Sequence, residues 1–180
     1  MSIDIRRATL NDVDVLTDII RNAFRDVADR FAITPENCPT HPSNCERAWI
    51  ESDLSRGVSY FLLIAQGLPC GCVAVEIASP DVCYLERLAV VPDRRNESFG
   101  RRLVNRALRE AEEAGTTTMS VGIIAKHSEV RDWYGRLGFV EDDERSFDHL
   151  PFEVAFLRYH LAASSRRGPG PRPRRRTACG

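Results

Sequence analysis

The stretch from Tyr84 to Leu103 (YLERLAVVPDRRNESFGRRL) has the composition of an anion-binding site. An apolar run ends at Val91, a polar loop containing Ser98 and Gly100 follows, and a helical pattern then begins. The first N–H groups of a helix are unpaired and lie at the positive end of its dipole, so such a junction attracts anions. Small residues let a phosphate approach the backbone. Four arginines can add charge-assisted donors: Arg94, Arg95, Arg101 and Arg102.

Two interpretations of this stretch stay open from these residues alone. It is a pyrophosphate-binding loop, or it is a solvated basic loop in front of an amphipathic helix. Of the 25 basic residues in the chain, only Lys126 is a lysine. A phosphate loop ending in Gly-Lys-Ser/Thr is therefore excluded, and a Schiff-base mechanism would have to use Lys126. Arginines and backbone amides are left as the candidate pyrophosphate ligands.

The elements that must position this stretch follow from apolar periodicity. Strands are expected at residues 3–8, 58–65, 70–78, 82–91, 117–125, from 139, and 152–160, and helices at 12–30, after Ser43 to about 56, 100–114 and 128–137. The order β-α-α-β-β-β-α-β-α-β-β predicts an α/β domain with a mixed, mostly antiparallel sheet flanked by helices, and residues 82–91 form a central strand. The expected helix caps are Thr9 or Asn11, a capping box from Ser43 to Glu46, and Ser128.

Composition divides the chain into a domain at residues 1–161 and a tail at residues 162–180. The tail is rich in Arg, Pro and Gly and has no apolar periodicity, so we expect it to be disordered. It contains six arginines and no acidic residue, whereas residues 1–161 carry 19 basic and 26 acidic side chains, a net charge of −7. The formal charge of −1 for the whole chain therefore averages two unlike parts. Nucleic-acid binding is not expected of the domain and would fall to the basic tail alone.

A second motif lies about thirty residues after the loop, in the segment Asp132-Trp-Tyr-Gly-Arg-Leu-Gly-Phe139. Together the two motifs resemble the GCN5-related N-acetyltransferase (GNAT) family. Arg95-Asn-Glu-Ser-Phe-Gly100 is similar to the family's acetyl-CoA motif, Arg/Gln-x-x-Gly-x-Gly/Ala, and Tyr134-Gly-Arg-Leu-Gly-Phe139 to its Tyr-x-x-x-Gly-Phe signature. The element order over residues 3–161 agrees with the same family.

The resemblance implies transfer of an acetyl group from acetyl-CoA, the acyl-donor substrate, to a primary amine of a small molecule, peptide or protein. An alkylammonium must lose a proton before it attacks, and Glu86 is the first candidate base, with Glu76 second. The family takes its oxyanion donor from the strand backbone, here around Leu88, Ala89 and Val90. Tyr134 matches the tyrosine that protonates the leaving thiolate. The remaining residues expected to bind the cofactor are Arg95, Asn96, Glu97, Ser98, Phe99, Gly100, Arg101 and His127.

Each assignment has an alternative. In the alternative for Glu86, it is a paired buried carboxylate, with Arg87 or another arginine as its partner. In the alternative for Tyr134, it is a core aromatic residue. Ser98 stands where the family usually has its first glycine, and His127 where many members have an asparagine. These two departures motivate a second function, an acyl-CoA-binding sensor or docking module without turnover.

The remaining features of the chain concern its location, metal binding, the acceptor region and the oligomeric state. The six cysteines are expected to be free thiols of a cytoplasmic protein, because no secretory signal and no membrane-length apolar run is present. Cys38, His41 and Cys45 lack a fourth ligand, so no metal is expected. The resemblance places the amine acceptor near residues 31–45, Glu76 and residues 147–152. The oligomeric state stays open, with a homodimer as one possibility.

Overall fold

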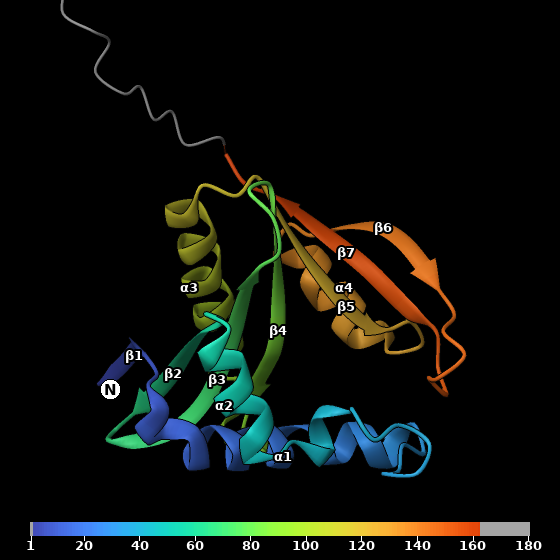
Figure 1. Cartoon of the computed structure of the whole chain (residues 1–180), viewed down its shortest axis with the longest axis horizontal. Coiled ribbons are helices and arrows are strands. Elements are labelled where there is room, and N and C mark those ends of the chain that lie inside the picture. Colours follow the sequence, from blue (N-terminus) through green and yellow to red (C-terminus); the bar gives the residue numbers. More distant parts are fainter. Residues whose placement is uncertain (1, 163–180) are drawn as a thin grey trace, which may run out of the picture.

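The computed structural model describes residues 2–162, so the tail predicted from residue 162 onward lies almost entirely outside the described residues. The chain forms a seven-stranded sheet with the order β1-β2-β3-β4-β5-β7-β6 (Figure 1). Its strands are β1 (Ile3–Arg7), β2 (Ser59–Ala65), β3 (Leu68–Ile77), β4 (Val82–Val90), β5 (Thr118–Ile124), β6 (Val140–Arg145) and β7 (Val154–His160). The α-helices are α1 (Val13–Arg30), α2 (Arg47–Ser55), α3 (Phe99–Ala114) and α4 (Ser128–Arg136). This order confirms the predicted α/β class and the central place of β4.

The sheet is antiparallel except where β4 meets β5. That parallel pairing is short: Val82, Cys83 and Tyr84 of β4 face Thr118, Met119 and Ser120 of β5. Beyond Tyr84 the two strands diverge, which gives the sheet its V-shaped outline (Figure 1). The remainder of β4, up to Val90, pairs with β3 on one side only. Its other edge therefore has backbone groups that no neighbouring strand occupies.

A bulge interrupts β4 shortly after the strands part. Cys72 of β3 faces Ala89, but Ala74, two residues on, faces Glu86, so β4 carries one extra residue here. Within the bulge, Arg87 has a φ of +48°, in the left-handed region that side chains other than glycine rarely adopt. A bulge of this kind re-aims the residues on either side of it.

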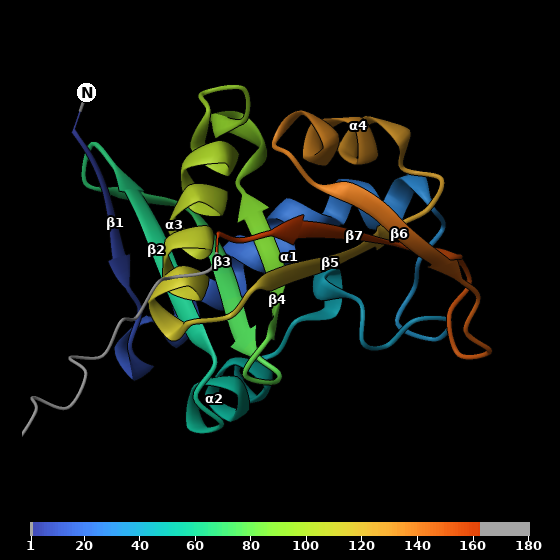
Figure 2. The same ribbon diagram turned by 90° about the horizontal axis from the view of Figure 1, so that it is seen from above.

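The helices cover the two faces of the sheet unequally. The faces are visible in Figure 2, where α3 lies over β2 and β3 and α1 lies on the far side. α1 and α2 bury Leu16, Ile20 and Ile50 against Tyr60 and other residues of β2, β3 and β4. We call this the α1 face.

The opposite face, the α3 face, holds the larger core. There α3 packs Leu103 and Val104 against Phe61 and Val73, and the same cluster includes Tyr134 and Phe139 near α4. A third, smaller cluster joins the end of α1 to the end of β5 through Ala28, Ile33, Cys38 and Ile124.

Two of the predicted helix caps are wrong. Ser43 does not open α2: residues Pro42–Asn44 form a 3-10 turn capped by His41, and α2 begins at Arg47 without a side-chain cap. Ser128 is the first residue of α4 rather than its cap, a position that His127 occupies. Thr9 does form a capping box with Asp12, but on a 3-10 turn that precedes α1.

Candidate active site

The predicted anion-binding loop has an unusual backbone. Asn96 has a φ of +66° and Ser98 a φ of +63°, so two residues other than glycine are left-handed within three positions. Ser98 is the N-cap of α3 and makes no side-chain cap hydrogen bond. The first intrahelical bond runs from the Arg102 N–H to the Ser98 carbonyl at 3.1 Å, which leaves the preceding N–H groups of the first turn free.

The arginines of this loop divide into two pairs. Arg94 and Arg95 are engaged: Arg94 donates to Glu97 at 2.7 Å, and Arg95 donates to the Ala23 carbonyl at 2.7 Å and pairs with Asp26 of α1. Arg101 and Arg102 are exposed and form no ion pair within residues 2–162. The first pair therefore ties the loop down, and the second is available to an anion.

The end of β4 leads directly into this loop. The Val91 N–H donates to the Cys70 carbonyl of β3 at 2.9 Å. Because the groups of an antiparallel strand alternate in direction, the Val90 N–H points the other way, toward the side where β5 has diverged. The predicted oxyanion donors, Leu88 to Val90, thus lie between the bulge and the anion-binding loop, on the unpaired edge of β4.

Glu86 lies on the α1 face of β4, opposite Ala74 of β3. Its side chain is partly buried and forms no hydrogen bond or ion pair with any residue that the structure describes. Burial raises the pKa of this carboxyl, with Arg87 opposing and Glu76 reinforcing the shift. A partly desolvated, unpaired carboxylate is the chemistry expected of a general base.

The alternative pairing of Glu86 with Arg87 is not formed. Arg87 instead contacts the Asp53 carboxylate of α2 and the Tyr60 hydroxyl. Glu76, the second candidate base, pairs with Arg56 at 2.8 Å. Of these acidic side chains on the α1 face, Glu86 is the one without an arginine partner among residues 2–162.

Tyr134 lies in the core of the α3 face and is 4% exposed. Its ring meets Trp133 at 4.9 Å and Phe139 at 5.1 Å, measured between ring centroids. Burial raises the pKa of its hydroxyl, and this hydroxyl has no hydrogen-bond partner in the described part of the chain. The hydroxyl oxygen is not fully buried, because among the described residues Arg106 Nη1 is the one fully buried side-chain polar atom without a partner. This O–H is therefore a donor available to a ligand.

His127 lies at the start of α4 against α1. Its ring is 5.4 Å from the Phe31 ring, and burial together with nearby Arg30 lowers the pKa of the imidazole. In the first turn of α4, Glu129 pairs with Arg30 at 3.0 Å. α4 also touches the anion-binding loop, because a Cβ added to Gly100 would lie 3.1 Å from the Trp133 ring.

The structure therefore gathers most of the predicted site around the diverging ends of β4 and β5. The loop, α4 and the end of α1 are mutual neighbours. Glu86 and Tyr134 are not in contact: they lie on opposite faces of the sheet, with the unpaired edge of β4 between them. Sequence reasoning missed the Asp53–Arg87–Tyr60 network. The one sign of this network in the sequence was Asp53, an acidic residue inside the helix α2.

The family model for the acetyltransferase (GNAT) family matches residues 21–139, well over half of the chain. The chain therefore belongs to the GNAT acetyltransferase family. No curated protein matches the sequence.

Solved structures share the fold at low sequence identity. The Escherichia coli ribosomal-protein-S18-alanine N-acetyltransferase is 16% identical, covers 93% of this chain and 99% of its own, and has a TM-score of 0.72. The Salmonella typhimurium protein yncA, solved with its cofactor acetyl-CoA, is 18% identical, covers 92% of this chain and 97% of its own, and has a TM-score of 0.69. The Thermoplasma acidophilum PaiA N-acetyltransferase, in complex with coenzyme A, is 16% identical, covers 89% of this chain and 99% of its own, and has a TM-score of 0.69.

Three further observations concern membrane spans, metal ions and thiols. Within residues 2–162, no helix is long and apolar enough to cross a membrane. The same residues contain no group of three or more His, Cys, Asp or Glu side chains placed to hold a metal ion. Cys38, Cys45, Cys70, Cys72 and Cys83 are buried free thiols.

Proposed function

We propose that this protein transfers an acetyl group from acetyl-CoA to a primary amine. The observation that carries this proposal is the placement of an unpaired carboxylate, Glu86, and an unpartnered hydroxyl, Tyr134, on either side of the unpaired β4 edge. Family membership supports acetyl transfer in general, and the two side chains supply the acid–base chemistry that an amine acceptor needs.

The residues present fit the donor substrate. The free N–H groups at the start of α3, with exposed Arg101 and Arg102, are suited to a pyrophosphate. The left-handed backbone at Asn96 and Ser98 shapes the loop that presents them. The unpaired edge of β4 offers hydrogen bonds to an extended arm, in the way a neighbouring strand would.

The chemistry then follows from proton positions. Glu86 accepts a proton from the ammonium, directly or through a water, so that the amine can attack the thioester carbon. Backbone N–H groups near Val90 stabilise the oxyanion of the tetrahedral intermediate. The Tyr134 hydroxyl donates a proton to the departing thiolate. His127 and Arg95 position α4 and the loop against α1.

The test is thiol release from acetyl-CoA across a panel of amines, combined with calorimetry of coenzyme A binding. Amine-dependent release of one thiol per acetylated product is expected. Binding without release on any amine would reject the transferase and favour the alternative, an acyl-CoA-binding sensor. Absence of binding would reject both functions.

A further inference from the structure

A pocket with three phenylalanines in its lining lies at the end of β5 and the start of β7. It has a volume of about 470 Å³. Its apolar lining includes Phe31, Phe147, Leu150 and Phe152, and its charged residues are Lys126 and Glu153. We call it the aromatic pocket. It is built from the end of α1, the residue pair after β5, and the loop between β6 and β7.

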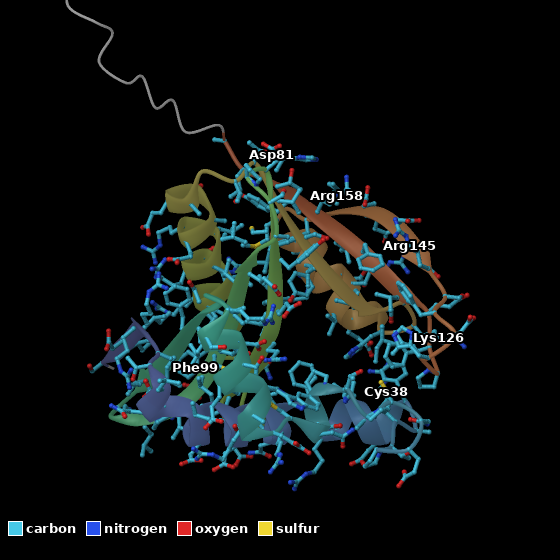
Figure 3. The ribbon with its side chains drawn as sticks, in the orientation of Figure 1. Cys38, Asp81, Phe99, Lys126, Arg145 and Arg158 are labelled. Atoms are coloured by element: carbon cyan, nitrogen blue, oxygen red, sulfur yellow. The ribbon has the colours of Figure 1, made fainter. Side chains whose placement is uncertain are left out.

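The aromatic pocket continues the face of the sheet that carries Glu86. Tyr84 faces Ser120 in the β4–β5 pairing, so Glu86 projects to the same side as Ser120, Gly122 and Ile124. Ile124 in turn belongs to the cluster against which Phe31, Leu150 and Phe152 pack. At this point the segment after α1 lies beside the end of β5, as the neighbouring labels of Cys38 and Lys126 show in Figure 3.

The two charged residues of the pocket differ in their partners. Glu153 accepts a hydrogen bond from the Ser146 hydroxyl at 3.1 Å. Lys126 forms no hydrogen bond or ion pair with any residue from 2 to 162. It is also the only lysine in a chain with 24 arginines. The charges of the two residues sum to zero, but Lys126 is exposed and is the cationic group of the pocket, without an ion-pair partner among the described residues.

A ligand that reaches both Glu86 and Lys126 extends from β4 to the end of β5. β5 ends at Ile124, and Lys126 follows in a turn that is closed by the hydrogen bond from the His127 N–H to the Ile124 carbonyl at 2.9 Å. Between the two groups, phenylalanine and leucine side chains provide an apolar wall for the body of the ligand.

We propose that the aromatic pocket holds the body of the acyl acceptor, and that this acceptor is a primary amine whose apolar body ends in a carboxylate. The amine lies at Glu86, the body lies among the phenylalanines, and the carboxylate pairs with Lys126. This proposal rests on the function proposed above, because it names the substrate class of the same site.

Three amines test the charge preference, since they share an aminomethyl-substituted ring and differ only at the para position. They are para-(aminomethyl)benzoate, benzylamine and para-xylylenediamine. We expect the benzoate to have a kcat/KM about tenfold above benzylamine, which is the effect of one charge-assisted contact. Lys126→Met should bring this ratio close to one, and Lys126→Arg should preserve most of it. Arg109→Met, on the exposed side of α3, is the matched charge-removal control and should leave the ratio as it is.

A preference for the diamine, or a ratio insensitive to Lys126→Met, would overturn the proposed acceptor class while leaving acyl transfer standing. Absence of thiol release with every amine would instead count against the transferase itself. The two failures are therefore distinguishable.

A binding experiment tests the pocket without turnover. Reductive methylation with isotope-labelled formaldehyde marks Lys126 and the chain's amino terminus and keeps the lysine charge. In protein saturated with coenzyme A, para-(hydroxymethyl)benzoate should shift the Lys126 signal, and benzyl alcohol should not. Phe147→Ala should weaken the apparent affinity several-fold. An unshifted Lys126 signal at saturating benzoate would overturn the proposal.

Discussion

The carboxylate of Asp53 in α2 pairs with the guanidinium of Arg87 in the bulge of β4. Asp53 is 5% exposed and also accepts a hydrogen bond from the Tyr60 hydroxyl at 2.7 Å. The bulge therefore has a partner outside the sheet, which holds a left-handed arginine in place. Since Glu86 precedes Arg87 and Leu88 follows it, this ion pair positions both the proposed base and the proposed oxyanion donors.

Asp53→Ala should destabilise the fold by about 3 kcal/mol, because removing one partner of a buried pair leaves the other charge uncompensated. Chemical denaturation measures the change. Glu51→Ala, which breaks the exposed pair of Glu51 with Arg47 on the same helix, should cost about 0.5 kcal/mol or less. Equal losses for the two variants would mean that the Arg87 bulge does not depend on its partner.

The substitution Glu86→Gln distinguishes between two roles of Glu86, that of a general base and that of a paired structural carboxylate. Loss of the base should lower kcat by about 100-fold or more. Burial raises the pKa of Glu86, so ionisation costs folding free energy, and this cost is fully present once the pH exceeds the folded-state pKa. The glutamine variant should therefore be more stable than the parent at neutral pH, with the difference vanishing below about pH 4.

Activity and thermal unfolding across pH measure both effects in the two proteins. The acidic limb of the wild-type kcat profile, at saturating amine, should lie above the ordinary glutamate pKa. A variant that loses stability at neutral pH would show that Glu86 is paired after all.

Tyr134→Phe should lower kcat by about 100-fold and leave the affinity for coenzyme A within about twofold, because only the proton donor is removed. The unfolding free energy should change little, since the hydroxyl has no partner among the described residues. Pre-steady-state thiol release and calorimetry give the two numbers. An unchanged rate of thiol release would show that Tyr134 is a core aromatic residue and not the proton donor.

Ser98→Gly should tighten coenzyme A binding several-fold and raise stability by about 1 kcal/mol, because a left-handed φ of +63° strains any residue with a Cβ. Asn96→Gly is the matched control at a φ of +66°. It should gain less, since asparagine tolerates this region better than serine does. Weaker binding by Ser98→Gly would indicate that the serine side chain itself contacts the ligand.

Apolar periodicity was enough to predict the order of the elements, because each strand and helix buries one consistent face. The loop before α3 was also predictable, since it depends on local residue types. Tyr134 was singled out by the resemblance to the family's Tyr-x-x-x-Gly-Phe signature, and its role stays a prediction. The Arg87 bulge was not, because nothing in an apolar strand marks an arginine as left-handed. The Asp53 partnership joins residues 34 positions apart.

The failed capping box has a local explanation. Ser43 and Glu46 have the required spacing, but Pro42 starts a tighter turn that places Glu46 in an extended conformation. The role proposed for Lys126 could not be predicted from sequence either, because the aromatic pocket is assembled from three separate segments.

The three residue pairs that join β4 to β5 have a mechanical consequence. They make the sheet two leaves, of four and three strands, with a seam at Val82–Tyr84 and a second attachment where α1 reaches the end of β5. In the binding mode proposed above, a donor along the free edge of β4 would take the place of a strand between the two leaves. We then expect part of its binding free energy to be spent on setting the angle between the leaves, and substitutions at the seam to change substrate affinity.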